Sequence, residues 1–173
     1  MGSSPTGPSA VQLAAYFGLI EVSSLLRHAV EQQLKEAGDL SYVQFQLLAT
    51  LGDAPDGSLR MTDLADGVVY SRSGLTYQAQ VLEKRGLVAR STSPDDERSV
   101  AVALTAQGSE VLGRVFPGHI AILDDLLFAR LTPGDVDALA DILGRVRDHM
   151  RHTPPRSAAA RRRRVAAPEG GLA

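Results

Sequence analysis

The sequence contains no cysteine and no tryptophan among its 173 residues, and aromatic residues make up only 5% of it. The absence of cysteine excludes thiolate catalysis, thiol redox sensing and Cys-ligated zinc or iron–sulfur sites. The shortage of aromatics argues against a base-stacking platform for nucleic acid. The patterns of a P-loop, a G-x-G-x-x-G turn and a G-x-S-x-G elbow are also missing. We therefore expect neither an enzyme nor a bound cofactor.

Long hydrophobic runs are missing as well. No uninterrupted apolar run reaches the ~18 residues of a membrane span. The first ten residues, MGSSPTGPSA, lack the charged start and apolar stretch of a signal peptide. With 44% hydrophobic and 22% charged residues, the chain has the composition of one globular domain. We expect a cytoplasmic protein that does not associate with membranes.

The net charge of −2 is unevenly distributed. Residues 154–173 hold five arginines, four of them in the run 161–164, and one glutamate, which gives +4 and leaves −6 for residues 1–153. This tail has no periodic apolar face, so we expect residues 154–173 to be disordered, as we do for residues 1–9. A solvated terminus is the favoured interpretation of the tail, and a basic arm that touches nucleic acid is the alternative.

The segment 10–40 predicts a long helix, because it has no proline and its apolar residues recur at helical spacing. The first half is apolar on nearly all sides, and such a helix must be buried on all sides. In a chain this small a second subunit is the natural cover, so we expect this segment to form a homodimer interface. Gly38 and Asp39 are placed to end the helix.

Segment 41–105 combines short helices with two short strands. Ser41, Thr62 and Ser71 are predicted N-caps of three helices, the last of which runs to Arg85 and ends at Gly86. Tyr70 and Leu75 stand at the positions of a hydrophobic staple. Strands are predicted at 87–90 and 100–104, joined by a polar, charged tip. Segment 106–153 then predicts two further helices, starting after Thr105 and Thr132, with Pro117 inside the first.

This order of elements predicts a mainly α fold with a small β-hairpin wing, namely a winged helix-turn-helix between long N- and C-terminal dimerisation helices. An α-helix fits the major groove of DNA, and its outer residues can reach base edges. In segment 71–85, Leu75, Ala79 and Leu82 recur at core spacing. The opposite face carries small or planar hydrogen-bonding groups, the residues Ser73, Thr76, Tyr77 and Gln80. Arg72, Lys84, Arg90 and Arg98 could bind phosphates.

A family resemblance rests on the run GLTYQAQVLEKRGLVARSTSPDDERSVAVALTAQG at 74–108. Its LEKRGLV segment, the D-x-R of Asp96 and Arg98, and the LT-x-x-G of 104–108 follow one another as in MarR-type transcriptional regulators. The upstream MTDLADGVVYSRSG (61–74) resembles the first half of that family's helix-turn-helix. The resemblance covers roughly residues 10–151. It implies a homodimeric winged-helix protein that binds double-stranded DNA at a palindromic operator, usually as a repressor released by small phenolic or anionic ligands.

The resemblance also implies roles for individual residues. Asp96 and Arg98 take the places of the wing pair that orders the hairpin and reaches DNA. Ser71, Ser73, Thr76 and Tyr77 fall on recognition-helix positions. Tyr77 stands where members often carry arginine, and Gln78 stands where an apolar residue is common, so operator preference is expected to differ from that of relatives.

Two further sites are weaker predictions. A pocket for a small aromatic or anionic effector could use the polar-tipped aromatics and one arginine near the dimer helices, with the candidates Tyr16, Arg27, Tyr42, Phe45 and Tyr70. Ordinary packing is the alternative for this set. His149 and His152 have a spacing that can hold zinc, but we favour solvated residues at a helix end and expect no metal.

Electrostatics supports DNA binding less clearly. Residues 60–100 hold six basic and six acidic residues, whereas DNA-binding surfaces usually show a basic footprint. DNA binding is therefore expected to be modest and strongly salt-dependent, with Asp63 and Asp66 turned away from the groove. A winged-helix module that binds another protein and has little DNA affinity is the alternative function.

Overall fold

The computed structural model describes residues 7–67, 71–93 and 96–152. It divides into one unit that runs to Leu127 and a second that starts at Phe128. In order along the chain, the elements are α1 (Ala10–Gly38), α2 (Tyr42–Gly52), β1 (Ser58–Arg60), α3 (Met61–Gly67), α4 (Arg72–Lys84), β2 (Val88–Ser93), β3 (Asp96–Leu104), α5 (Ala106–Leu126), the 3-10 turn η1 (Phe128–Arg130) and α6 (Pro133–His152). The predicted mainly α fold with a β-hairpin is confirmed.

Capping residues set most helix starts where the sequence predicts them. Ser41 accepts the N–H of Gln44 at 3.3 Å, and the Gln44 side chain returns a bond to the Ser41 N–H. Thr105 caps α5 in the same way. Ser9, within the segment expected to be disordered, caps α1. Among the predicted caps, Thr62 differs: α3 begins at Met61, so Thr62 lies in its first turn instead of capping it.

The two helix ends predicted at glycine residues differ in the structure. Gly86 closes α4 with a φ of 72°, the left-handed conformation that suits glycine. At the end of α1, however, Asp39 and not Gly38 adopts the left-handed conformation, with φ 50°. Gly38 is needed there for a different reason, because a Cβ on it would lie 2.6 Å from Val115 Cγ1 of α5.

A three-stranded antiparallel sheet completes the head, with the order β1-β3-β2. β2 and β3 form the predicted hairpin, in which Val88 pairs with Leu104 and Arg90 with Val102. β1 was not predicted from the sequence. It adds Ser58–Arg60 along the other side of β3, where Leu59 pairs with Val102.

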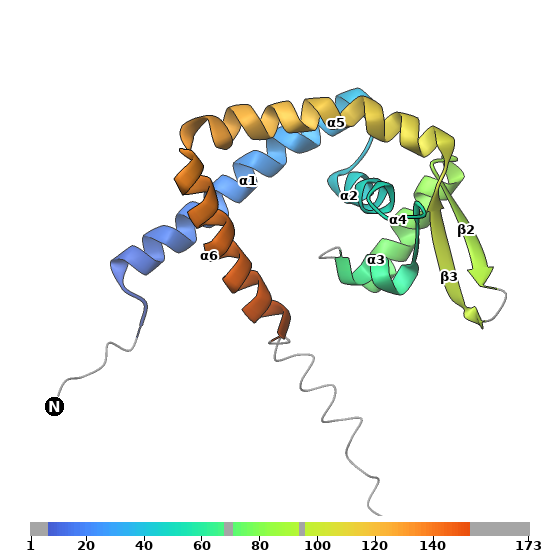
Figure 1. Cartoon of the computed structure of the whole chain (residues 1–173), viewed down its shortest axis with the longest axis horizontal. Helices are drawn as coiled ribbons and strands as arrows, with labels where there is room; N and C mark the ends of the chain where they lie inside the picture. Colours follow the sequence, from blue (N-terminus) through green and yellow to red (C-terminus); the bar gives the residue numbers. More distant parts are fainter. Residues whose placement is uncertain (1–6, 68–70, 94–95, 153–173) are drawn as a thin grey trace, which may run out of the picture. The chain divides into compact units, whose positions relative to one another are not determined.

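One apolar core joins the C-terminal half of α1, α2, α3, α4, the sheet and the first half of α5. In Figure 1, α5 runs alongside α1, and the β2–β3 hairpin lies at the N-terminal end of α5. Leucines supply most of the fully buried side chains, namely Leu34, Leu40, Leu47, Leu48, Leu51, Leu64, Leu75 and Leu82. This core fixes α4 relative to α1 and α5.

The N-terminal half of α1 takes no part in that core. Its apolar side chains are exposed, among them Val11 (78%), Phe17 (61%) and Leu25 (65%), and the buried residues of α1 begin only at Val30. By length and composition α1 is apolar enough to cross a membrane, the only such helix in the described ranges. The sequence analysis missed this property of α1 because it considered only uninterrupted apolar runs. A helix can be apolar on average and still contain scattered polar residues. A soluble helix covered by a partner meets the same criterion.

The second unit also leaves apolar side chains exposed. Thr132 caps α6, and its backbone N–H and hydroxyl both donate to the Asp135 carboxylate, which lowers the pKa of that group. Along α6 an apolar stripe is only partly covered, and its side chains at Leu143, Val146 and Met150 are exposed. Apolar side chains are thus exposed on both α1 and α6, and a homodimer interface at these helices stays a prediction.

Candidate nucleic-acid interface

The helix expected to contact DNA is α4, and its inner face is firmly held. The Ser71 hydroxyl accepts the N–H of Gly74 at 3.2 Å and so starts the helix. Leu75, Ala79 and Leu82 point inward and are at most 1% exposed. Leu75 and Leu82 pack in the same core as Leu64 of α3 and the leucines of α2. The three helices therefore form a rigid support for whatever the other face of α4 carries.

The outer face of α4 is open to solvent. Ser73, Thr76, Tyr77 and Gln80 are all exposed, Tyr77 over 61% of its surface. Their hydroxyl and amide groups can donate and accept hydrogen bonds without carrying charge. A helix of 13 residues with such a face has the size and the groups that the major groove accepts. The four residues predicted to meet base edges thus lie together on one surface.

The wing is described only in part. Arg72, Asp96 and Arg98 have side chains outside the described part of the structure, as does Asp66, and Tyr70 lies outside it altogether. Lys84 is exposed at the end of α4. Arg90 on β2 has a partner within the head: its Nε lies 3.1 Å from Glu83 Oε2, although the N–H is not aligned for a hydrogen bond. Arg90 is therefore less available to phosphate than the sequence suggested.

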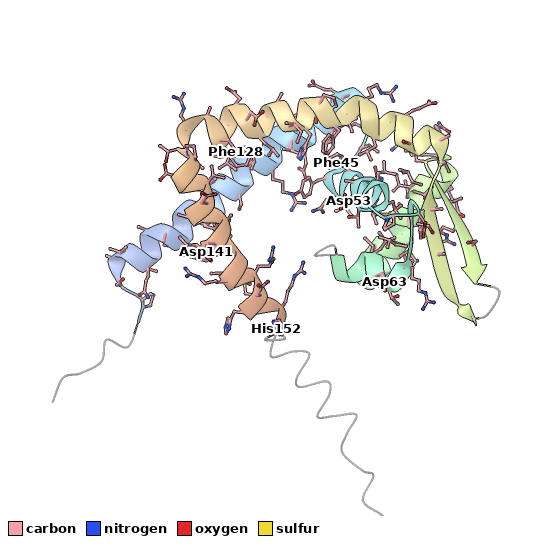
Figure 2. The ribbon with its side chains drawn as sticks, in the orientation of Figure 1. Phe45, Asp53, Asp63, Phe128, Asp141 and His152 are labelled. Carbon is pink, nitrogen blue, oxygen red and sulfur yellow. The ribbon has the colours of Figure 1, made fainter. Side chains whose placement is uncertain are left out.

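Negative charge remains on the surface of the head. Asp63, near the start of α3 (Figure 2), is exposed. Its carboxylate accepts a hydrogen bond from the Thr62 hydroxyl at 3.3 Å. Arg90 and Arg85, two of the six basic residues in 60–100, are engaged with groups of the same chain. The described part of the head thus offers fewer outward cations than a count of basic residues predicts.

The residues proposed for an effector pocket are only partly brought together. The Arg27 guanidinium lies over the Tyr42 ring, 5.3 Å from its centroid, and both line a cavity of about 400 Å³ with Ser23, Ser24 and Leu26. Arg27 also forms an ion pair with Glu31 at 3.0 Å.

The remaining members of that set lie elsewhere. Tyr16 contacts Phe17 edge-to-face on the exposed half of α1. It stands eleven residues before Arg27, or roughly 16 Å along the helix at 1.5 Å per residue. Within a single chain Tyr16 therefore does not line the cavity of Arg27 and Tyr42, and a role for it in an effector pocket stays a prediction. Phe45, labelled in Figure 2, is only 5% exposed. It packs on His119 of α5, with ring centroids 4.6 Å apart.

Sequence reasoning missed His119. It is half-buried between Phe45 and Phe116, and its Nδ1 has no hydrogen-bond partner in the described structure. Burial lowers the pKa of His119 below its ordinary value of 6.5, because the apolar surroundings disfavour the charged imidazolium. Its position on α5 shortly after Pro117 gave no signal, since the contact with α2 depends on tertiary packing.

This burial predicts a pH-dependent stability. Well above pH 6.5 the imidazole is neutral in both the folded and the unfolded state, and its contribution to stability is complete. As the pH falls below 6.5, the unfolded chain takes up the proton first, so the free energy of unfolding should decrease. Urea titrations between about pH 8 and about pH 5 measure this loss of stability. The His119→Gln variant should lose less stability than the wild type over this range, because it has no imidazole to protonate. His149→Gln, on the exposed end of α6, is the control, and equal pH profiles for wild type and His119→Gln would contradict the assignment.

The histidine pair of α6 lies on the surface near the end of the helix. His149 and His152 are exposed, and His152 Nδ1 lies 2.7 Å from the Asp148 carbonyl oxygen. Among the residues that the structure describes, no three potential ligand side chains gather.

Comparison with known proteins finds relatives among transcriptional regulators. The sequence model of the MarR family matches residues 38–99. The chain is 30% identical over 123 residues to the transcriptional repressor MprA of Escherichia coli (strain K12). This match covers 71% of this chain and 69% of MprA. It is also 30% identical over 109 residues to the HTH-type transcriptional repressor YetL of Bacillus subtilis (strain 168). That match covers 63% of this chain and 65% of YetL, just under two thirds of the relative's length.

Solved structures extend the similarity over most of the fold. A MarR family transcriptional regulator from Streptomyces coelicolor, solved in complex with DNA, matches with a TM-score of 0.82 at 32% identity, over 90% of this chain and 96% of that one. AbsC, a MarR family transcriptional regulator from the same organism, matches with a TM-score of 0.80 at 28% identity, over 85% and 99%.

Proposed function

Because the chain belongs to the MarR family of transcriptional regulators, we propose that it is a repressor that binds a palindromic operator as a homodimer in the cytoplasm. Members of this family are DNA-binding regulators and not enzymes. The observation that carries the proposal is the outer face of α4, on which four exposed hydrogen-bonding side chains stand over a fully buried leucine face.

Base recognition is assigned to the middle of α4. Ser73, Thr76, Tyr77 and Gln80 would meet base edges in the major groove, where the pattern of donors and acceptors differs for every base pair. Tyr77 offers an aromatic ring and a hydroxyl in place of a guanidinium, so a bidentate contact to guanine is not expected at that point. Specificity would rest more on amide and hydroxyl pairing and on contact with thymine methyl groups.

Phosphate contacts are assigned to the ends of α4 and to the wing. Ser71, Arg72 and Lys84 flank the recognition helix, and its N-terminal N–H groups favour an anion. Asp96 and Arg98 would order the hairpin and reach the adjacent groove. Arg90 is placed last in this group, because Glu83 already holds it.

Dimerisation is assigned to the exposed apolar faces of α1 and α6. Large side chains such as Phe17 on α1 and Met150 on α6 would otherwise remain in water. A symmetric pair of heads would place two recognition helices about one turn of DNA apart, ~34 Å. The operator would then be an inverted repeat.

A small aromatic acid is the proposed effector. Arg27 supplies a cation and Tyr42 a ring with a hydroxyl at one cavity, which suits a carboxylate and an aromatic ring. A ligand that binds better to the form of the dimer with unsuitable head spacing would lower DNA occupancy. Purified protein on operator DNA should therefore release it on addition of an aromatic acid, and Arg27→Gln should require more of the acid.

The direct test is binding of the purified full chain to duplex from the region upstream of its own gene. We expect affinity well above that for a shuffled duplex of equal composition, and a steep loss between low and physiological salt, since each neutralised phosphate contributes about −0.9 to the slope of log K against log salt. Equal affinity for both duplexes would contradict the proposal. Arg98→Ala separates it from the protein-binding alternative, because only a DNA-binding wing should lose duplex affinity.

A further inference from the structure

We propose that Arg85 is a positioning residue, which fixes the recognition helix on the C-terminal end of α1 and makes no contact with DNA. This rests on the proposed function, because it assigns a role in DNA recognition. In the sequence, Arg85 is one of the six basic residues of segment 60–100, and no individual role was predicted for it. In the structure it caps α4, and its guanidinium is directed toward α1.

The guanidinium of Arg85 binds the end of α1 at two points. Nη1 donates to the Asp39 carbonyl oxygen at 2.7 Å, and Nη2 donates to the Gly38 carbonyl oxygen at 3.2 Å. Carbonyls at a helix C-terminus have no partner within the helix and carry partial negative charge. The Asp39 carboxylate lies 3.9 Å from Nη2. With 31% of its side chain exposed, Arg85 has its donors committed to this helix end.

Two glutamines extend the connection to the middle of α4. Arg85 Nη1 lies 3.5 Å from Gln44 Oε1, and Gln44 Nε2 donates to Gln78 Oε1 at 2.9 Å. Gln44 is 8% exposed and is the one buried polar side chain in the described part of the chain. Removal of one partner would leave buried amide groups unpaired, so the network favours a single arrangement of α1, α2 and α4. Gln78, unusual for the family, therefore has a partner.

The C-terminal end of α1 is itself held in place by close packing. Gly38 packs so closely on α5 that an added Cβ would lie 2.6 Å from Val115 Cγ1. Arg85 thus connects the recognition helix to the place where α1 and α5 meet. Because α1 also carries the proposed dimer face, a displacement of α1 would be transmitted through Arg85 to α4. The adjacent Lys84 differs in that it is exposed.

The experiment compares Arg85→Met and Arg85→Lys with Lys84→Met in the full chain. Affinity for duplex from the upstream region is measured over a series of salt concentrations, at a temperature where thermal melts show each variant to be folded. Both Arg85 variants should lose affinity on the order of tenfold, with the salt slope unchanged. Arg85→Lys should not restore the affinity, because one ammonium group cannot replace a planar guanidinium whose N–H groups reach three acceptors. Lys84→Met should instead reduce the slope by about one.

A second measurement uses the protein without DNA. Amide hydrogen exchange should accelerate in residues 38–45 and 74–85 of both Arg85 variants, and not in Lys84→Met. A reduced salt slope in Arg85→Met, wild-type affinity in Arg85→Lys, or unchanged exchange would each overturn the proposal. If Arg85→Met does not fold, Arg85→Lys carries the comparison. Should the wild type bind no duplex while exchange changes as expected, the proposed function fails and the Arg85 contact stands.

Discussion

Leu143→Glu is expected to leave the chain folded but monomeric, and to lower its affinity for a duplex with two half-sites by about a hundredfold or more. Leu143 lies on the exposed apolar stripe of α6, between Val136 and Val146. A carboxylate on a covered face would lose its hydration without gaining a partner, so association should fail. Each head would then bind alone, without the gain in affinity that two linked contacts give. Sedimentation and duplex titration of the same sample measure both effects.

Ala138→Glu is the matched control. Ala138 lies on the opposite side of α6 and is exposed, so the same charge is added without touching the apolar stripe. This variant should remain dimeric and bind as the wild type does. A dimeric Leu143→Glu with full affinity would show that α6 does not form the subunit interface.

Gly108→Ala is expected to lower the free energy of unfolding by about 2–3 kcal/mol. A Cβ at this position would lie 2.0 Å from the Leu87 carbonyl oxygen, and backbone cannot yield as a flexible side chain can. Gly108 is the glycine of the LT-x-x-G motif, three residues after the cap Thr105, to whose hydroxyl its N–H donates at 3.0 Å. The close contact joins the start of α5 to the first residues of the wing. Urea titration monitored by circular dichroism measures the change.

Gly113→Ala, one and a half turns further along α5, is the control. A Cβ there meets nothing within 4 Å, so the substitution should only improve helix propensity and raise stability by up to ~1 kcal/mol. Opposite signs for the two substitutions are the expected result. Equal effects would mean that the contact with Leu87 does not determine the need for glycine.

Local chemistry explains what the sequence predicted well. The caps at Ser41, Ser71 and Thr105 depend on side chains that bond backbone three residues away, so they can be recognised in sequence. The inward face of α4 follows from helical spacing. The outer face of α4 was placed correctly for the same reason, although its contact with DNA stays a prediction.

Features that depend on distant partners were missed. Ser58–Arg60 is too short to show a period of two, and it becomes a strand only by pairing with β3. Arg85 was only counted among the basic residues of 60–100, because charge and position in sequence do not show that it reaches Gly38 and Asp39. Tyr16 was assigned to the pocket by residue type, whereas distance along α1 separates it from Arg27. In each case the deciding contact lies far away in the sequence or in space.

The central claim is that the outer face of α4 reads bases as part of a symmetric pair. It is tested most directly by selecting bound duplexes from a random-sequence pool with the wild type and with Gln80→Ala. We expect the wild type to enrich an inverted repeat whose half-sites lie one helical turn apart, and Gln80→Ala to relax the preference at one symmetry-related pair of positions only. No enriched sequence with the wild type, or an identical motif from both proteins, would contradict the account.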